Sequence, residues 1–411
     1  IKENIVVLGI IVLTIIMILL FQAVGFQSYS RYSTDTLHYE KASVVEVSSE
    51  ELEYDEELGM YLGSQELEVE MLDGEKKGEI ISVTNYLAKT HSVYAEEGTK
   101  IIISADRPEG TEPYYSVYNY DRTLPYVSSL LILAAAIICI GKGKGVKAIL
   151  GLAYSLFLIV YLVLPAVFSG YSPTVMSILC AVLSTAVTLL LLNGQSKKTY
   201  AAIIATTLGV FLALVLFMLM SWMLHLNGFS SSEAEDLILI NEATGLRIKD
   251  LLFAGVLISS LGAIMDVGMS IVSALFELLH HNPELSSGEL FKSGIEIGKD
   301  MIGTMTNTLI LAFTGSAFIT LLVFVSYQVQ ANQLFNSNYI AIEIAQGICG
   351  TFGIVLTVPI ASAVSAVMLI RNKKEQDSIS GETGYNHNFP EMLFLYFILL
   401  TKNYFILMEI S

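Results

Sequence analysis

Cysteine and tryptophan are nearly missing from this chain, whose 411 residues include three Cys and one Trp. Cys139, Cys180 and Cys349 all fall in apolar segments and none belongs to a C-x-x-C pair, so neither disulfides nor zinc sites are indicated. Glycine-rich phosphate loops, G-x-S-x-G elbows and H-E-x-x-H motifs are absent from the sequence as well. We therefore expect no metal, no cofactor and no enzymatic activity.

Charged residues are also scarce: they make up 15% of the chain against 54% hydrophobic residues, and the mean hydropathy is positive. This composition is typical of an integral membrane protein with many spans. Eight apolar runs are long enough to cross a bilayer. They lie at about residues 5–25, 125–140, 148–169, 175–192, 201–225, 251–279, 302–327 and 339–370. The first run is longer than the core of a typical secretion signal and no A-x-A-like site follows it, which favours a retained anchor.

Lysines and arginines are unevenly distributed over the short loops between these runs. Alternate loops carry them, whereas the loops at 170–174 and 328–338 have none. The basic loops hold Lys142, Lys144 and Lys147, then Lys197 and Lys198, then Lys292 and Lys299, and finally Arg371, Lys373 and Lys374, and only Arg247 and Lys249 break the pattern. By the positive-inside rule, the N-terminus and the tail lie in the cytoplasm and residues 27–124 lie outside the cell membrane.

The sequence therefore predicts an α-helical integral membrane protein of about eight transmembrane helices, with a small extracytoplasmic all-β domain between helices one and two. The predicted regions are a transmembrane anchor at 1–26, an acidic β domain at 27–124, a seven-helix transmembrane domain at 125–372 and a cytoplasmic or interfacial tail at 373–411. Within the tail, the apolar segment 391–410 fits either an interfacial helix or a ninth span.

The predicted external domain is strongly acidic. Residues 27–124 contain 21 Asp and Glu against eight Lys and Arg, so most of the net charge of −17 lies there. Such a surface is unsuited to nucleic acid; it either gathers cations or is simply a solvated surface. Runs with a period near two predict about five strands in a small antiparallel barrel or sandwich, with Asp73-Gly74 as a turn. These runs lie at 41–47, 65–71, 78–83, 100–105 and 114–120.

A single aspartate, Asp266, lies near the middle of the apolar run from Leu251 to Leu279. An Asp at the centre of a membrane helix costs about 2.5 to 3.5 kcal/mol, so this side chain has to face protein or water rather than lipid. Its polar neighbours follow at steps of three or four residues, which places them on one helical face. They are Ser259, Gly262, Ser270, Ser273 and Glu277.

The next span begins near Asp300 and repeats this pattern. Its polar stripe consists of Thr304, Asn307, Thr308, Thr314 and Gly315. Because one short loop joins the two helices, the two stripes can face each other inside a bundle. We interpret Asp266 as an ion-coupling carboxylate with Thr304, Asn307, Thr308 and Asp300 as partners. The alternative for the Ser, Thr and Gly positions is helix packing without transport.

Three further residues are secondary candidates. Ser270 and Glu277 lie on the stripe of Asp266, and Glu277 lies beside the pair His280-His281. Glu343, near the outer end of the last span, is a second ionisable residue within an apolar run. For Glu343, simple exposure at the membrane surface is the alternative.

The segment 262–309 resembles a known family. Gly262-Ala263-Ile264-Met265-Asp266-Val267-Gly268, then Asn282-Pro283, then Gly298-Lys299-Asp300-Met301-Ile302-Gly303-Thr304, closely resemble the core of the YibE/YibF-like multi-pass membrane proteins. The resemblance covers most of residues 1–372. It implies a multi-pass topology and no particular activity.

A more distant likeness is to one half of the resistance-nodulation-division exporters and their SecD/SecF relatives. In that superfamily an Asp on one span carries protons and residues on the next spans complete the relay; here Asp266 matches that carboxylate. The chain departs from the pattern in having two extra spans before Asp266 and no intramembrane Lys. Because that superfamily commonly pairs two such units, the likeness implies a homodimer or a sister membrane protein as partner.

Two classes of function remain open. The first is a cation- or proton-coupled transporter with Asp266 as the coupling carboxylate. The second is a membrane scaffold or sensor that transports nothing and binds a ligand or partner through its external β domain. Membrane lipid is an expected partner in both classes, and nucleic acid is not.

Overall fold

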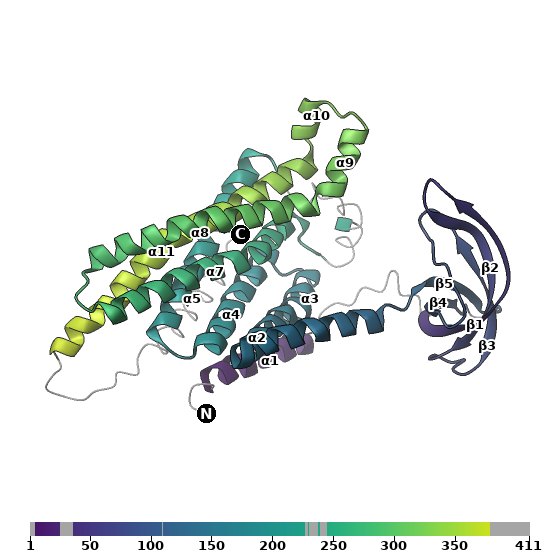
Figure 1. Ribbon diagram of the computed structural model, residues 1–411, viewed down its shortest axis with the longest axis horizontal. Coiled ribbons are helices and arrows are strands. Elements are labelled where there is room, and N and C mark those ends of the chain that lie inside the picture. Colours follow the sequence, from purple (N-terminus) through teal and green to yellow (C-terminus); the bar gives the residue numbers. More distant parts are fainter. Residues whose placement is uncertain are drawn as a thin grey trace. The chain divides into compact units, whose positions relative to one another are not determined.

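The computed structural model describes residues 5–24, 36–108, 110–226, 229, 237–238 and 245–378 (Figure 1). The chain divides into two compact units, one made of Ile1–Met176 and Ser232–Leu251, the other of Ser177–Ser231 and Leu252–Ser411. The tail segment 391–410, predicted as an interfacial helix or a ninth span, lies outside the described residues.

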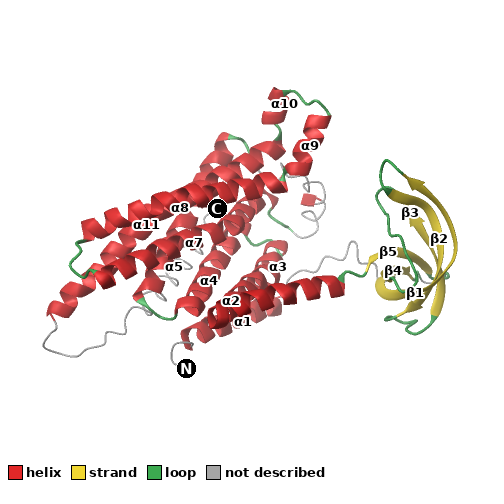
Figure 2. Cartoon of the chain, in the orientation of Figure 1, coloured by secondary structure: helices red, strands yellow, loops and turns green. Residues whose placement is uncertain are grey.

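Five antiparallel strands form one sheet in the first unit (Figure 2). They are β1 (Leu37–Asp55), β2 (Met60–Met71), β3 (Ile80–Leu87), β4 (Lys100–Asp106) and β5 (Tyr114–Tyr120). Their order across the sheet is β3-β2-β1-β4-β5. The two edge strands approach each other, so the sheet curls into a half-barrel. The predicted small antiparallel domain of about five strands is confirmed.

Alternation along the strands builds the core of this domain in spite of its acidic composition. Leu67, Val69 and Met71 on β2 are fully buried, and the glutamates between them are more exposed. Ile101 and Ile103 on β4 are buried in the same core. Since successive side chains of a strand point to opposite faces, one strand supplies both an apolar core and a charged surface.

Asp73 and Gly74 lie between β2 and β3, as predicted for a turn. Gly74 has φ +78°, a left-handed conformation that glycine adopts without a steric penalty. The Oδ1 atom of Asp73 accepts a hydrogen bond of 2.5 Å from the backbone N–H of Lys41. The turn is therefore tied to the first strand.

Helices α1 (Ile5–Val24) and α2 (Thr123–Leu158) belong to the same unit. The hydroxyl groups of Thr14 on α1 and Tyr154 on α2 lie 2.9 Å apart and share a buried hydrogen bond. After α2 come a π-helical turn, η2 (Ile159–Val163), and α3 (Leu164–Phe168), which has a proline in its first turn. Because Pro165 has no N–H to donate, a change of helix type next to it is expected.

Within α2 the backbone breaks at Lys142, whose dihedral angles (φ 48°, ψ −129°) are not helical. A methyl group on Gly145 would lie 3.2 Å from the Cα of Ile138. In a continuous helix these residues would be about 10 Å apart along the axis. The chain therefore folds back at Lys142, at the position of the predicted basic loop between spans two and three.

The remaining helices lie mainly in the second unit, and most of them are long and apolar. They are α4 (Pro173–Asn193), α5 (Lys197–Met223), α7 (Leu251–His281), α8 (Ser287–Ser316), α9 (Phe318–Ser326), α10 (Ala331–Phe335) and α11 (Asn338–Ser378), and a short 3-10 turn, η4 (Ile248–Asp250), precedes α7. Helix α11 packs against both α5 and α8, and Figure 1 shows α8 and α11 side by side.

Glycines allow these helices to approach closely. A methyl group on Gly353 of α11 would lie 2.6 Å from Ile264 Cδ1 and 2.9 Å from Ala213 Cβ, and one on Gly298 of α8 would overlap Val358. Between membrane helices the hydrophobic effect is weak, so association depends on close van der Waals packing at small residues. The glycine-bearing face of α11 thus holds α5, α7 and α8 together.

Five helices among the described residues are long and apolar enough to cross a membrane, or six if α8 and α9, bent by 55° at Ala317, count as one broken span. A shorter apolar helix lies at Val6–Leu20. Thr123–Phe168 counts as one of the five, although it reverses at Lys142. The chain is therefore a membrane protein with several spans; the total of eight stays a prediction.

Candidate functional site

Helix α7 presents Asp266 on the side opposite to its packing face. Ile264, Gly268 and Ile271 are buried, whereas Asp266 is exposed. A methyl group on Gly268 would lie 2.9 Å from the Thr206 hydroxyl of α5, which shows how closely the buried face packs. Since each residue turns a helix by about 100°, Asp266 points away from this contact.

The polar stripe predicted around Asp266 follows the same exposed face of α7. Ser259, Gly262, Ser270 and Glu277 are all exposed there. No hydrogen bond or ion pair joins the Asp266 carboxylate to another residue in the part of the chain that the structure describes. A carboxylate at mid-span, without a partner and beside small residues, is the central feature of this site.

At the end of α7 the stripe reaches a charged group. The Nε2 atom of His281 lies 3.3 Å from a carboxylate oxygen of Glu277, one helical turn away, and both side chains are well exposed. The rings of His280 and His281 meet edge to face with 5.7 Å between their centroids. An exposed pair of this kind contributes little to stability.

Helix α8 begins one short loop later and also has two faces. Its residues Gly294 and Gly298 are buried, and added methyl groups there would overlap Ser362 and Val358 of α11. The predicted stripe lies on the other side: Asp300, Thr304, Asn307, Thr308, Thr314 and Gly315 are all exposed. On α8, as on α7, these stripe residues are exposed and the closely packed glycines are buried.

The hydroxyl groups of Thr304 and Thr308 donate hydrogen bonds to backbone carbonyls of α8 itself. Thr304 donates to the carbonyl of Met301 at 3.1 Å, and Thr308 donates to that of Thr304 at 3.0 Å. Threonine commonly satisfies its hydroxyl in this way within a helix. Among the described residues, therefore, no hydrogen bond joins Asp266 to Thr304, Asn307 or Thr308, and their joint relay stays a prediction.

The first turn of α8 is fixed by a capping box. Ser286 is the N-cap: its Oγ accepts from the Glu289 N–H at 3.3 Å, and its own N–H donates to Glu289 Oε2 at 2.9 Å. This capping box ends the loop that follows α7 and sets the first turn of α8.

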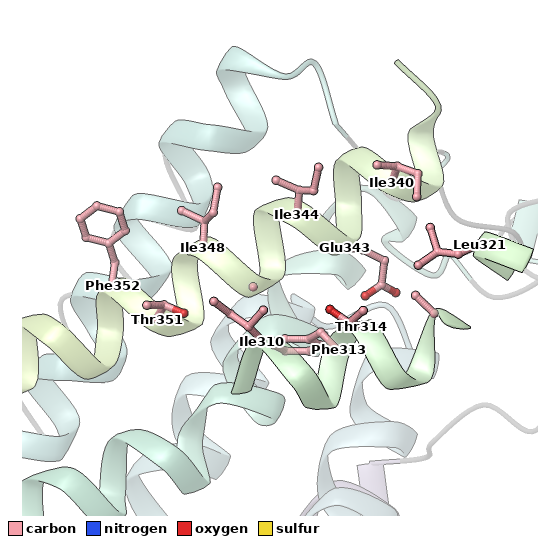
Figure 3. Close-up of a pocket in the computed structure, with 12 residues that line it drawn as sticks. Ile310, Phe313, Thr314, Leu321, Ile340, Glu343, Ile344, Ile348, Thr351 and Phe352 are labelled. Carbon is pink, nitrogen blue, oxygen red and sulfur yellow. The ribbon is translucent and has the colours of Figure 1, made fainter. Parts of the chain in front are cut away.

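A second candidate site lies around Glu343 in the first turns of α11. A pocket of about 460 Å³ lies between α8, α9 and α11, and Figure 3 shows the Glu343 side chain directed into it near Thr314. The Oε2 atom of Glu343 is buried and, among the described residues, has no hydrogen-bond partner; the same holds for the Thr351 hydroxyl. Glu343 was only a secondary candidate from the sequence, because segments some thirty residues apart form this pocket.

The β domain has a hollow of its own. It measures about 450 Å³ and is lined by Tyr86 of β3, Ser104 of β4, Tyr118 and Asn119 of β5, and His91, which follows β3, among others. Tyr118 also meets Tyr39 edge to face, with 4.8 Å between the ring centroids. Within the described residues, no group of three or more His, Cys, Asp and Glu is arranged to hold a metal ion.

The helices, the half-barrel and the polar residues within apolar spans define an α-helical membrane protein with a small β domain. A model of the YibE/F-like protein family matches residues 129–371, more than half of the chain. The chain belongs to this family, as the motif at 262–309 predicts. Searches of curated proteins and of solved structures gave no match. The likeness to the resistance-nodulation-division exporters has no support from these comparisons and stays an expectation.

Proposed function

We propose that this protein is a cation- or proton-coupled transporter of the cell membrane in which Asp266 is the coupling carboxylate. The observation that carries the proposal is the position of Asp266, at mid-span on the exposed face of α7 and without a partner among the described residues. Burying an unpaired charge against lipid costs about 2.5 to 3.5 kcal/mol, so this face meets water or another protein surface.

The roles of the remaining residues follow from their positions. Ser259, Gly262 and Ser270 keep the surface around Asp266 small and polar, which leaves room for water. Asn307 on α8 offers a side-chain amide, and Asp300 places a second carboxylate toward the start of that stripe. Loading and release of a cation or proton at Asp266 changes its charge, and the packing of the helices responds to this change.

A second copy of the chain, or a sister protein of the same family, completes the site in this proposal. The exposed stripes of α7 and α8 are too polar to face lipid, and an interface of small and hydroxyl residues suits helix association. In the proposed orientation, residues 27–124 are extracytoplasmic, and the N-terminus is cytoplasmic. We assign no enzymatic activity, cofactor or nucleic acid to the protein.

Proton flux into liposomes tests the proposal. Purified wild-type protein and the Asp266→Asn variant are reconstituted with a trapped pH-sensitive dye, and a pH gradient is imposed. We expect flux in the wild type and none in Asp266→Asn, with partial flux in Asp266→Glu because the charge is kept. Glu296→Gln is the matched control, since Glu296 is exposed on α8 and, among the described residues, pairs only with Lys299, at 2.6 Å. Equal flux in the wild type and Asp266→Asn refutes the role of Asp266.

The hollow of the β domain favours a second candidate, a membrane sensor or scaffold. Exposed tyrosines and polar side chains around a curved sheet suit a ligand or a partner segment. This function predicts that Asp266→Asn is tolerated in the cell and that Tyr86→Ala and Tyr118→Ala are not. The coupled transporter predicts the opposite order.

A further inference from the structure

The pocket around Glu343 is apolar apart from a few oxygen atoms. Its walls include Ile310 and Phe313 of α8 and Ile344, Ile348 and Phe352 of α11. In Figure 3, Glu343 and Thr314 lie toward one end, and Thr351 lies farther along α11. A volume of about 460 Å³ falls within the range of pockets that hold small organic molecules.

One oxygen of the Glu343 carboxylate lacks a hydrogen-bond partner among the described residues. Its Oε2 atom is buried, and in the described part of the chain nothing donates a hydrogen bond to it. A buried charge without a partner is strongly disfavoured, so such groups are found paired. No Lys or Arg lines the pocket. A bound cation would supply the missing positive charge.

The walls of the pocket decide what kind of cation fits. An inorganic ion loses its water on entry and needs several oxygen ligands in exchange. Here, Glu343, Thr314 and Thr351 are the only lining residues with side-chain oxygens, and Thr351 is two helical turns from Glu343. An organic cation instead buries its apolar body against the isoleucines and the rings of Phe313 and Phe352, and pairs its charge with Glu343.

We propose that the pocket between α8, α9 and α11 binds a lipophilic organic monocation, with Glu343 as its counter-ion. Ile344, Ile348 and Phe352 are exposed on the outer wall, so a lipophilic molecule reaches the pocket from the surrounding apolar phase. The inference concerns a site on other residues than Asp266 and holds whether or not Asp266 couples transport.

Equilibrium binding of tetraphenylphosphonium to the purified full-length chain in detergent tests the proposal. Tetraphenylborate, which has the same shape and the opposite charge, is the ligand control. We expect the wild type to bind the cation and not the anion. Glu343→Gln keeps the shape of the side chain and removes the charge, and it weakens binding of the cation by at least about tenfold. Glu296→Gln makes the same chemical change at an exposed site and leaves binding unchanged.

A second variant tests the pocket without changing the charge of Glu343, in case Glu343→Gln fails to fold. Gly347 lines the pocket, and a methyl group there would have only Phe313 within 4.0 Å. Gly347→Leu therefore fills the pocket while Glu343 keeps its charge, and we expect it to lose binding of the cation as well. Asp266→Asn retains binding in this proposal, which separates the two sites. Cation binding that survives both Glu343→Gln and Gly347→Leu, or equal binding of tetraphenylborate, overturns the inference.

Discussion

The guanidinium of Arg107 donates two parallel hydrogen bonds to the carboxylate of Glu40 on β1, with N–O distances of 2.8 Å and 2.9 Å. Glu40 is 6% exposed. The hydrogen bonds that Arg107 donates to Glu40 hold the pKa of Arg107 well above its usual range, outweighing the opposite effect of burial. The acidic β domain thus contains one nearly buried, geometrically matched ion pair.

Removal of one member of this pair leaves a buried charge without a partner. We expect Arg107→Ala to destabilise the β domain by about 3 kcal/mol. Hydrogen exchange of the strand amides in the full-length chain measures the effect. Replacement of both residues, as Glu40→Gln with Arg107→Met, costs less than Arg107→Ala alone; additive losses would show that the two side chains act independently.

Gly74 is expected to tolerate no side chain. Its φ of +78° disfavours other residues, and a methyl group there would overlap the Glu40 carboxylate. Gly74→Ala therefore strains the turn and displaces the ion pair, with a loss of about 1–3 kcal/mol. Gly78→Ala has a similar φ of +83° but open space around the added methyl group, so it isolates the backbone component. Equal losses in both variants would exclude a role for the contact with Glu40.

The stability of the β domain is expected to depend on pH through Asp121. Hydrogen bonds from the side chain and backbone of Thr123 lower the pKa of Asp121, and Lys41 Nζ lies 3.3 Å from its carboxylate. A lowered pKa stabilises the fold above the ordinary value near 3.9, and this stabilisation is lost as the pH falls through the lowered pKa. Asp121→Asn should remove part of that acid sensitivity, by less than about 1 kcal/mol. Acid unfolding curves of the two proteins provide the comparison; an unchanged acid limb contradicts the prediction.

Replacement of glycine by alanine is expected to destabilise the second unit at Gly353 but not at Gly262. Gly353→Ala places a methyl group 2.9 Å from Ala213 Cβ, so overpacking should cost about 1–3 kcal/mol. Gly262→Ala meets nothing within 4 Å and should be neutral for folding. Thermal unfolding in detergent measures both. A loss of stability in Gly262→Ala equal to that in Gly353→Ala would mean that α11 is not the packing centre.

Substitutions of Thr308 and Asn307, two residues of the polar stripe on α8, are expected to affect transport to different extents. Thr308 already donates to the Thr304 carbonyl, so Thr308→Val should lower flux less than Asn307→Leu does. Asn307 lies exposed on the same stripe, and in the proposed mechanism Asn307→Leu lowers flux more than tenfold. The liposome assay compares the proton flux of the two variants. A lower flux in Thr308→Val than in Asn307→Leu would show that Asn307 is not part of the site.

Local pattern was enough to predict several elements of this protein. A period of two residues located all five strands, since each strand alternates between core and solvent whatever its partners are. Apolar length identified the membrane helices, because each has to match the thickness of a bilayer. The three- and four-residue steps around Asp266 and Thr304 likewise depend only on helix geometry.

Only the tertiary structure decided which face of each helix is buried by neighbouring helices. It buried Gly268 and Gly298 against neighbouring helices and left Asp266 and Asn307 exposed, a choice that depends on how α5, α7, α8 and α11 pack. It also formed the pocket of Glu343 from three helices. Periodicity finds the faces of each helix, but which face is buried is determined by contacts between segments far apart in the chain.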